Sequence, residues 1–200
     1  MRKRNRRDRG FTLLEAMIVI GIMFILAGLA VIQSFGSLQG YQANSAQDTV
    51  VSQLRVARQL AISQRRYVQV QFNTVATPPT VSYTVLPRPN SGDVPQASVT
   101  VVLPRQTGYM QESGPGDTPM AFGTCGTAGV CIAGVSGGPA VMLFTPSGQF
   151  TDSTLVNAIN GTVFIGMTNH KNTARAVTIM GATGRVRPYT YVDASTGWME

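Results

Sequence analysis

The chain has 200 residues, enough for one ordinary domain with an additional segment, and 44% of them are apolar while only 12% are charged. So few charges argue against a soluble helical bundle, and a count of two cysteines excludes a disulfide-rich mini-domain. The net charge of +7 is concentrated at one end, because residues 1–10 carry six basic side chains and one acidic one, so the high basicity describes a short N-terminal tag.

Residues 11–32 form a nearly uncharged apolar run in which Glu15 is the single charge. A helix of that length spans about 33 Å, which matches the hydrocarbon thickness of a bilayer, and the basic residues before it would stay cytoplasmic. A secretory signal is disfavoured, since the run exceeds the usual ~7–15 residues and no A-x-A-like site follows. A plain membrane anchor is the other alternative, but it leaves Glu15 unexplained, because a carboxylate inside the membrane costs about 2.5–3.5 kcal/mol.

The N-terminal residues carry a more specific pattern. Basic residues, then Gly10, then the run Phe11-Thr12-Leu13-Leu14-Glu15 resemble the processing signal of type IV prepilins and type II secretion pseudopilins. This resemblance implies that prepilin peptidase, a membrane aspartyl enzyme, cuts after Gly10 and methylates Phe11. It also implies that Glu15 faces the amine of Phe11 in a neighbouring pilin or pseudopilin subunit. The physics agrees, because a buried carboxylate and a buried ammonium are tolerated only as a pair.

The resemblance also implies a location. The protein would first cross the inner membrane once, through residues 11–32, with its C-terminal domain in the periplasm. Assembly with other subunits would then move it to a filament tip or to the cell surface.

Residues 33–65 are expected to continue the helix as an amphipathic periplasmic half. Residues 41–65 contain no Gly or Pro, and Val50, Leu54, Ala57 and Ala61 recur at i, i+4, i+7 and i+11. This spacing predicts one apolar stripe that packs on a globular domain.

From residue 66 onward the apolar pattern changes to a period of two, which predicts strands. We expect one antiparallel β domain over 66–200, with about seven short strands at 67–72, 81–86, 98–103, 140–144, 162–167, 175–180 and 185–192. The runs Phe144-Thr145-Pro146-Ser147-Gly148 and Gly184-Arg185-Val186-Arg187 resemble stretches of FimT/GspH-type minor pilins. That resemblance implies an α+β fold in which a long N-terminal helix packs on a two-sheet antiparallel β domain.

Residues 104–139 are expected to form an irregular loop, because they hold nine glycines and, after Pro104, three prolines. This loop carries both cysteines, Cys125 and Cys131, which enclose five residues. In an oxidising periplasm we expect them to form a local disulfide. A metal site would need more ligands, and the single histidine, His170, lies far along the chain, so we expect neither a metal nor a cofactor.

One hydrolase-like pattern is present in this loop. Ser136 lies in a G-x-S-x-G run between Gly134 and Gly138, and Asp152 and His170 follow in the order of a catalytic triad. A nucleophile elbow requires a strand before the serine and a helix after it, whereas Pro139 and a further predicted strand follow here. We therefore expect no catalytic residues and no enzymatic activity, with His170 in a turn.

The C-terminal strand is the one place where a specific binding function is indicated. Alternation places Val186, Thr190 and Val192 on one face and, on the other, Arg185, Arg187, Tyr189 and Tyr191. Guanidinium groups hold phosphates and aromatic rings stack on bases, so this second face is suited to DNA.

The G-R-x-R pattern resembles a C-terminal signature of FimT-like minor pilins that is tied to DNA capture in natural transformation. It implies that Arg185 and Arg187 contact the backbone of double-stranded DNA, helped by Lys171 and Arg175. A solvated edge strand whose arginines discourage edge pairing is the alternative. Two functions therefore remain open: a DNA-binding minor pilin, or an H-type pseudopilin of a type II secretion system without DNA binding.

Overall fold

The computed structural model describes residues 12–88, 92–111, 119–122, 129–132, 135–136, 141–151 and 157–200. The chain divides into two compact units, Met1–Leu38 and Gln39–Glu200. One helix, α1 (Leu13–Gln64), supplies the described part of the first unit and the beginning of the second.

The first turn of α1 is capped by Thr12. The Thr12 hydroxyl accepts a hydrogen bond from the backbone N–H of Glu15 at 3.2 Å, and the Thr12 carbonyl accepts the first helical bond, from Ala16. Thr12 and Glu15 thus occupy the two positions of a T-x-x-E capping box, a helix-start signal that agrees with the observed boundary.

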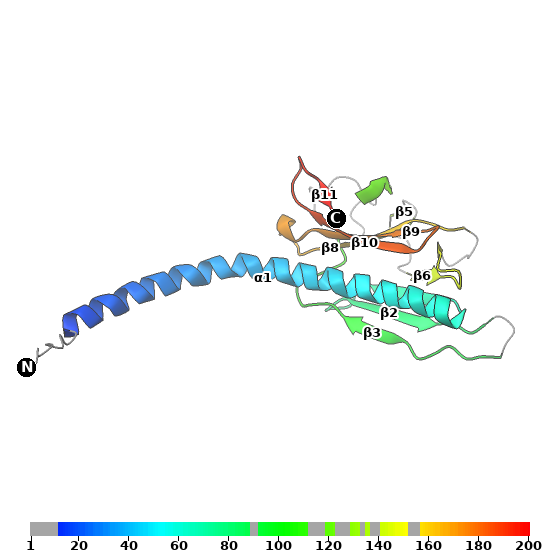
Figure 1. Cartoon of the computed structure of the whole chain (residues 1–200), viewed down its shortest axis with the longest axis horizontal. Helices are drawn as coiled ribbons and strands as arrows, with labels where there is room; N and C mark the ends of the chain where they lie inside the picture. Colours follow the sequence, from blue (N-terminus) through cyan, green and yellow to red (C-terminus); the bar gives the residue numbers. More distant parts are fainter. Residues whose placement is uncertain are drawn as a thin grey trace, which may run out of the picture. The chain divides into compact units, whose positions relative to one another are not determined.

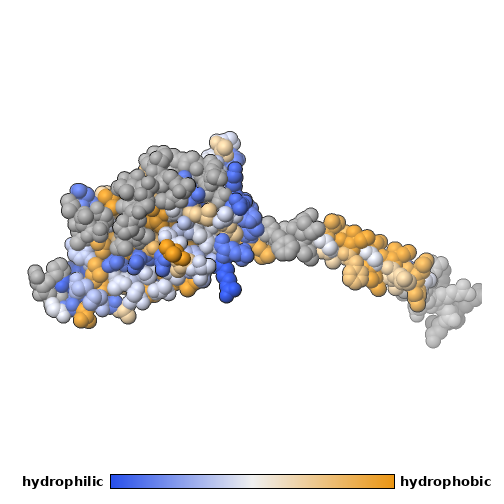
Figure 2. Space-filling view, turned by 180° about the vertical axis from the view of Figure 1, so that it is seen from behind, coloured by the Kyte–Doolittle hydropathy of each residue, from blue (hydrophilic) through white to orange (hydrophobic). Residues whose placement is uncertain are grey.

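The helix of the first unit carries exposed apolar side chains. Between Leu13 and Leu29 the described side chains are exposed and mostly large and apolar, and Figure 2 shows them as an apolar surface. By length and mean hydropathy, none of the helices in the described residues qualifies as a membrane span.

In the second unit, α1 packs on the β domain through the predicted stripe. Val50, Leu54, Ala57 and Ala61 are completely buried, which confirms the periodicity argument. The helix ends in a Schellman motif, in which the N–H of Arg66 donates to Ala61 and that of Arg65 to Ile62. Arg65 adopts the left-handed conformation there, with φ at 52°.

The first sheet is antiparallel and has the strand order β3-β2-β1-β6-β7. Its members are β1 (Val68–Asn73), β2 (Thr80–Val85), β3 (Val99–Val102), β6 (Val141–Phe144) and β7 (Phe150–Thr151). In β1, the buried Val68, Val70 and Phe72 alternate with polar residues, so period-two alternation decides which face meets the core.

The second sheet is also antiparallel and has the order β11-β10-β9-β8-β4-β5. Its members are β4 (Val130–Ile132), β5 (Val135–Ser136), β8 (Gly161–Ile165), β9 (Arg175–Met180), β10 (Arg185–Tyr191) and β11 (Trp198–Met199). Two short 3-10 helices, η1 (Pro119–Ala121) and η2 (Lys171–Thr173), complete the described elements.

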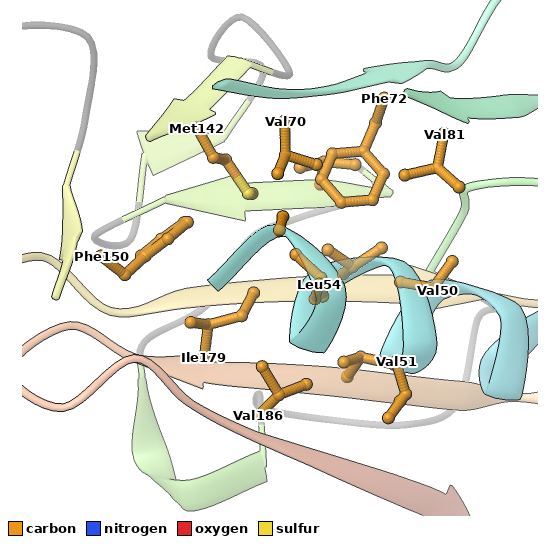
Figure 3. Packing of buried hydrophobic residues seen from close by; sticks show 14 of the residues in the cluster. Val50, Val51, Leu54, Val70, Phe72, Val81, Met142, Phe150, Ile179 and Val186 are labelled. Atoms are coloured by element: carbon orange, nitrogen blue, oxygen red, sulfur yellow. The ribbon is translucent and has the colours of Figure 1, made fainter. Parts of the chain in front are cut away.

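One core joins the helix to both sheets (Figure 1 and Figure 3). Val50, Val51 and Leu54 of α1 point toward first-sheet side chains such as Val70 and toward second-sheet side chains such as Ile179. All residues of this core belong to Gln39–Glu200, so this unit holds its own hydrophobic core. The expected α+β fold, a long N-terminal helix with a two-sheet antiparallel domain, is confirmed.

All seven expected strands are present, but four short ones were not expected. β4 and β5 lie inside residues 104–139, so the expectation of a wholly irregular loop is wrong. β4 forms because Val130 and Cys131 are buried beside β8. The many glycines around these two residues made a strand difficult to predict from the sequence. β7 and β11 have two residues each, too few to show a periodicity.

Candidate nucleic-acid interface

The glycine of the G-R-x-R pattern occupies the turn between β9 and β10. Gly184 has φ at 62° and donates its N–H to Met180 at 2.7 Å. A Cβ placed on Gly184 would overlap the carbonyl oxygen of Gly148 and lie 2.9 Å from Nε of Arg58. Arg58 in turn donates from Nε to the Gly148 carbonyl at 3.2 Å. The two glycine-containing runs singled out in the sequence therefore meet at the helix, and Gly184 has a structural reason to be glycine.

Polar side chains of α1 hold β9 and β10 in place. Nε2 of the buried Gln47 donates to the carbonyl of Ala176 at 3.0 Å and to that of Tyr189 at 2.9 Å. These two residues are direct partners in the β9–β10 ladder, so one side chain fixes both strands on the helix.

The two faces of β10 separate as the alternation predicts. Val186 is buried in the main core, whereas Tyr189 is buried in a second cluster on the other side of the strand. That cluster contains Cys131, Phe164 and Ala176 as well, with Trp198 packed against it. Tyr191 lies edge-on to Trp198, with ring centroids 5.4 Å apart. The Tyr189 ring is therefore part of a packed cluster and is not open for stacking on a base.

The two arginines of the pattern have different surroundings. Arg185 is exposed and has no partner among the described residues. Arg187 is 27% exposed and donates from Nη1 to Oε2 of Glu200 at 2.9 Å. A hydrogen bond with Tyr189, and to a lesser extent the charge of Glu200, raises the pKa of Arg187. The Glu200 carboxylate therefore competes with a phosphate for the Arg187 guanidinium.

The surface between these arginines is small and partly apolar. Met120, Thr178 and Met180 line it together with Arg185 and Arg187. Met120 belongs to η1, and its Sδ accepts a weak hydrogen bond from the Thr178 hydroxyl at 3.8 Å. The segment around Met120 thus forms one border of the basic surface, which the sequence did not indicate.

The side chain of Arg175 is buried, contrary to the prediction that it helps to bind DNA. It is 6% exposed, and its Nε donates to Oδ1 of Asn44 at 2.8 Å. Its Nη1 donates to the carbonyls of Asn172 and Ala174. Burial away from water lowers the pKa of Arg175. The guanidinium therefore anchors α1 to the segment before β9.

Lys171 is exposed but lies toward the end of β9 that is far from Arg185. In the ladder Arg185 faces Met180 and Thr190 faces Arg175, so the Lys171 side of β9 lies about five residues, or ~17 Å, from Arg185. Of the four predicted DNA contacts, the structure brings only Arg185 and Arg187 together.

The N-terminal and cysteine sites are described only in part. Gly10, Phe11 and Cys125 lie outside the described residues. Glu15 is exposed in the first turn of α1. Cys131 is disulfide-bonded, and its pairing with Cys125 stays a prediction.

The residues of the hydrolase-like pattern do not form a recognisable site in the described part. Ser136 lies in β5, His170 is half-buried with its Nε2 3.4 Å from Nε2 of Gln39, and Asp152 lies outside the described residues. Within the described ranges no three His, Cys, Asp or Glu residues are grouped closely enough to hold a metal ion.

Comparison with known proteins gives one family match and a set of similar structures. Residues 5–31 match the prokaryotic N-terminal methylation motif. The chain is similar to the minor pseudopilin EpsH from the type 2 secretion system of Vibrio cholerae, at 11% identity over 74% of this chain and 97% of that one, with a TM-score of 0.45.

The chain is also similar to the type IV minor pilin FimU of Pseudomonas aeruginosa, at 17% identity over 80% of this chain and 94% of that one, with a TM-score of 0.45. Among curated proteins no significant match was found. The methylation motif is followed, in the same chain, by the rest of a long helix and by two antiparallel sheets.

Proposed function

We propose that this protein is a minor subunit of a type IV filament machine. Prepilin peptidase cuts it after Gly10 and methylates Phe11, and the helix then joins it to other subunits through pairing of Glu15 with a neighbouring Phe11 amine. It is stored in the inner membrane with its β domain in the periplasm until it enters the filament. The match of residues 5–31 to the methylation motif is the observation that carries this proposal.

We also propose that Arg185 and Arg187 bind double-stranded DNA weakly and without sequence preference, and that this binding serves DNA uptake. Arg185 is exposed without a partner among the described residues, and Arg187 lies on the same face of β10. Two phosphate contacts give a salt dependence with a slope of roughly −2 on logarithmic axes. Arg175 is left out of the binding set, because it is buried and its Nε and Nη1 donate inside the protein.

The test is a titration of duplex DNA with the Gln39–Glu200 unit, followed by fluorescence anisotropy over a salt series. This unit lacks the basic residues 1–10, which would bind DNA by themselves. Changing Arg185 and Arg187 to Ala should abolish binding. The matched control changes Arg55 and Arg65, two exposed arginines without partners among the described residues, and should keep most of the binding. Equal losses in both double variants would mean that net charge alone is responsible.

A second candidate is an H-type pseudopilin of a type II secretion machine that does not bind DNA. The pairing of Arg187 with Glu200 and the burial of Arg175 favour it, since they leave few free cations beside Arg185. Absence of binding at low salt, where two arginines are most effective, would decide for this candidate. Neither result would affect the proposal of a filament subunit.

A further inference from the structure

The strand β3 forms one border of the first sheet. In the described part of the chain it pairs only with β2, and Figure 1 shows it at the outer side of that sheet. The N–H of Leu103, the residue after β3, donates to the Pro79 carbonyl at 2.9 Å on the β2 side. Because backbone groups alternate along a strand, Thr100 and Val102 direct their N–H and C=O groups away from β2.

This border lacks the usual protection against pairing with another chain. Natural edge strands carry charges, prolines or bulges, or are very short. Residues 94–104 contain no charged residue, and the prolines at 95 and 104 lie outside β3. Val99 and Val102 are 43% and 55% exposed. The other border strands of the described part, β5, β7 and β11, have only two residues each.

We propose that the outer edge of β3 binds an extended segment of a neighbouring pilin-type subunit by β-strand addition. This inference rests on the proposed function, because it places the neighbour in the same filament. The added strand hydrogen-bonds to Thr100 and Val102 and continues the sheet by one strand. On its inner face it carries apolar side chains beside Val101, which packs against the main core, and Val99.

The size of the edge decides between a neighbour in the filament and a free second copy. Four residues make a strand about 13 Å long, which buries far less than the ~1,200 Å² of a stable interface. Such an edge cannot hold two molecules together in dilute solution. A subunit that is already tethered beside it through the helices meets the edge at a high effective concentration, so a short strand is sufficient.

The test is photo-crosslinking of the full chain in cells that assemble the filament. A photoreactive amino acid replaces Thr100, and the filament fraction is analysed by mass spectrometry. We expect a crosslink to an extended segment of a pilin-type subunit. The crosslink should be lost with Val102→Lys, because a charge on the edge discourages pairing, and should remain with Val192→Lys. Val192 is 51% exposed and follows β10 of the other sheet, which makes it a matched control.

Three results would overturn the inference: no crosslink in assembled filaments, a crosslink to a protein of another class, or a crosslink that Val102→Lys leaves unchanged. Unfolding of the two lysine variants of Gln39–Glu200, followed by circular dichroism, should match that of the parent and so exclude misfolding. Dimerisation of the isolated unit that Val102→Lys removes would assign the edge to a second copy instead. If the chain never enters the filament fraction, the proposed function itself has failed.

Discussion

The conformation and contacts of single turn residues explain features of this structure that the neighbouring sequence does not indicate. Gly184 is a case in which the same residue belongs to a functional-looking pattern and to a tight structural contact. Its positive φ is unfavourable for any residue with a side chain, and a Cβ at this position would overlap the Gly148 carbonyl. The glycine of G-R-x-R therefore cannot be used as evidence for DNA binding, and only the two arginines carry that hypothesis.

Gly184→Ala should destabilise the protein more than Gly197→Ala. Both glycines have positive φ, which costs an alanine about 1–2 kcal/mol, but only at Gly184 would the new methyl group meet other atoms. Overpacking adds about 1–3 kcal/mol there. Urea unfolding of the Gln39–Glu200 unit measures both values, and equal losses for the two variants would contradict the close contact at Gly148.

Asp193 should show an unusually acidic titration. Its Oδ1 accepts hydrogen bonds from the N–H and hydroxyl of Ser195 and from the N–H of Thr196, which lower its pKa from 3.8 to about 2. The stabilisation is complete above the ordinary pKa and is lost as the pH falls through about 2. Carboxyl NMR should give this midpoint, and Ser195→Ala should raise it. A midpoint near 4 in the parent would mean that the turn is not formed in solution.

At this scale the sequence predicted which side chains share a face of β10, because the period of a strand is fixed. It could not predict their environment. Arg175 is buried because it meets Asn44, which lies 131 positions earlier, and Arg187 is paired because β11 returns Glu200 to it. Both facts depend on contacts between distant parts of the chain, which a local pattern does not contain.

At the scale of elements, α1 illustrates what periodicity can and cannot give. Its apolar stripe was predictable, because apolar residues at helical spacing identify the face that packs. The sequence predicted the end of the helix to within a residue or two. It did not indicate the Schellman motif there, because Arg65, and not the usual glycine, takes the left-handed position. The short strands β4 and β11 were missed because strands of two or three residues have no measurable period.

Arg65→Gly should stabilise the protein by about 0.5–1 kcal/mol. Arg65 is exposed and has no partner among the described residues, so the change relieves left-handed strain without removing a contact. The control is Arg55→Gly, in the same helix and also exposed, which should destabilise by about 1 kcal/mol. Thermal unfolding distinguishes them by opposite shifts, and a destabilised Arg65→Gly variant would contradict the observed helix end.

For the whole molecule, the division into two units separates the methylation motif from the hydrophobic core. The unit Gln39–Glu200 contains that core and both proposed binding surfaces, whereas the unit Met1–Leu38 contains the motif. The motif was readable from sequence because it is local and contiguous. The edge of β3 was not, because it became a border only when the strand order was known.

Glu15→Ala should leave cleavage after Gly10 intact and prevent entry into filaments. Glu15 is also the third helical residue after Thr12, so its loss could act through the helix cap as well as through pairing between subunits. A second variant distinguishes these two effects. Glu15→Gln keeps a side chain suited to the capping box but removes the charge. Fractionation of host cells should find both variants excluded from filaments, and normal incorporation of Glu15→Gln would refute pairing with the Phe11 amine.

The most direct test of the account is mass spectrometry of the mature N-terminus of the protein isolated from its own cells. We expect a chain that begins at Phe11, lacks residues 1–10 and carries one methyl group on its amine. A chain that keeps residues 1–10, or that is cut at another position, would contradict both the proposed prepilin processing and the proposed filament function.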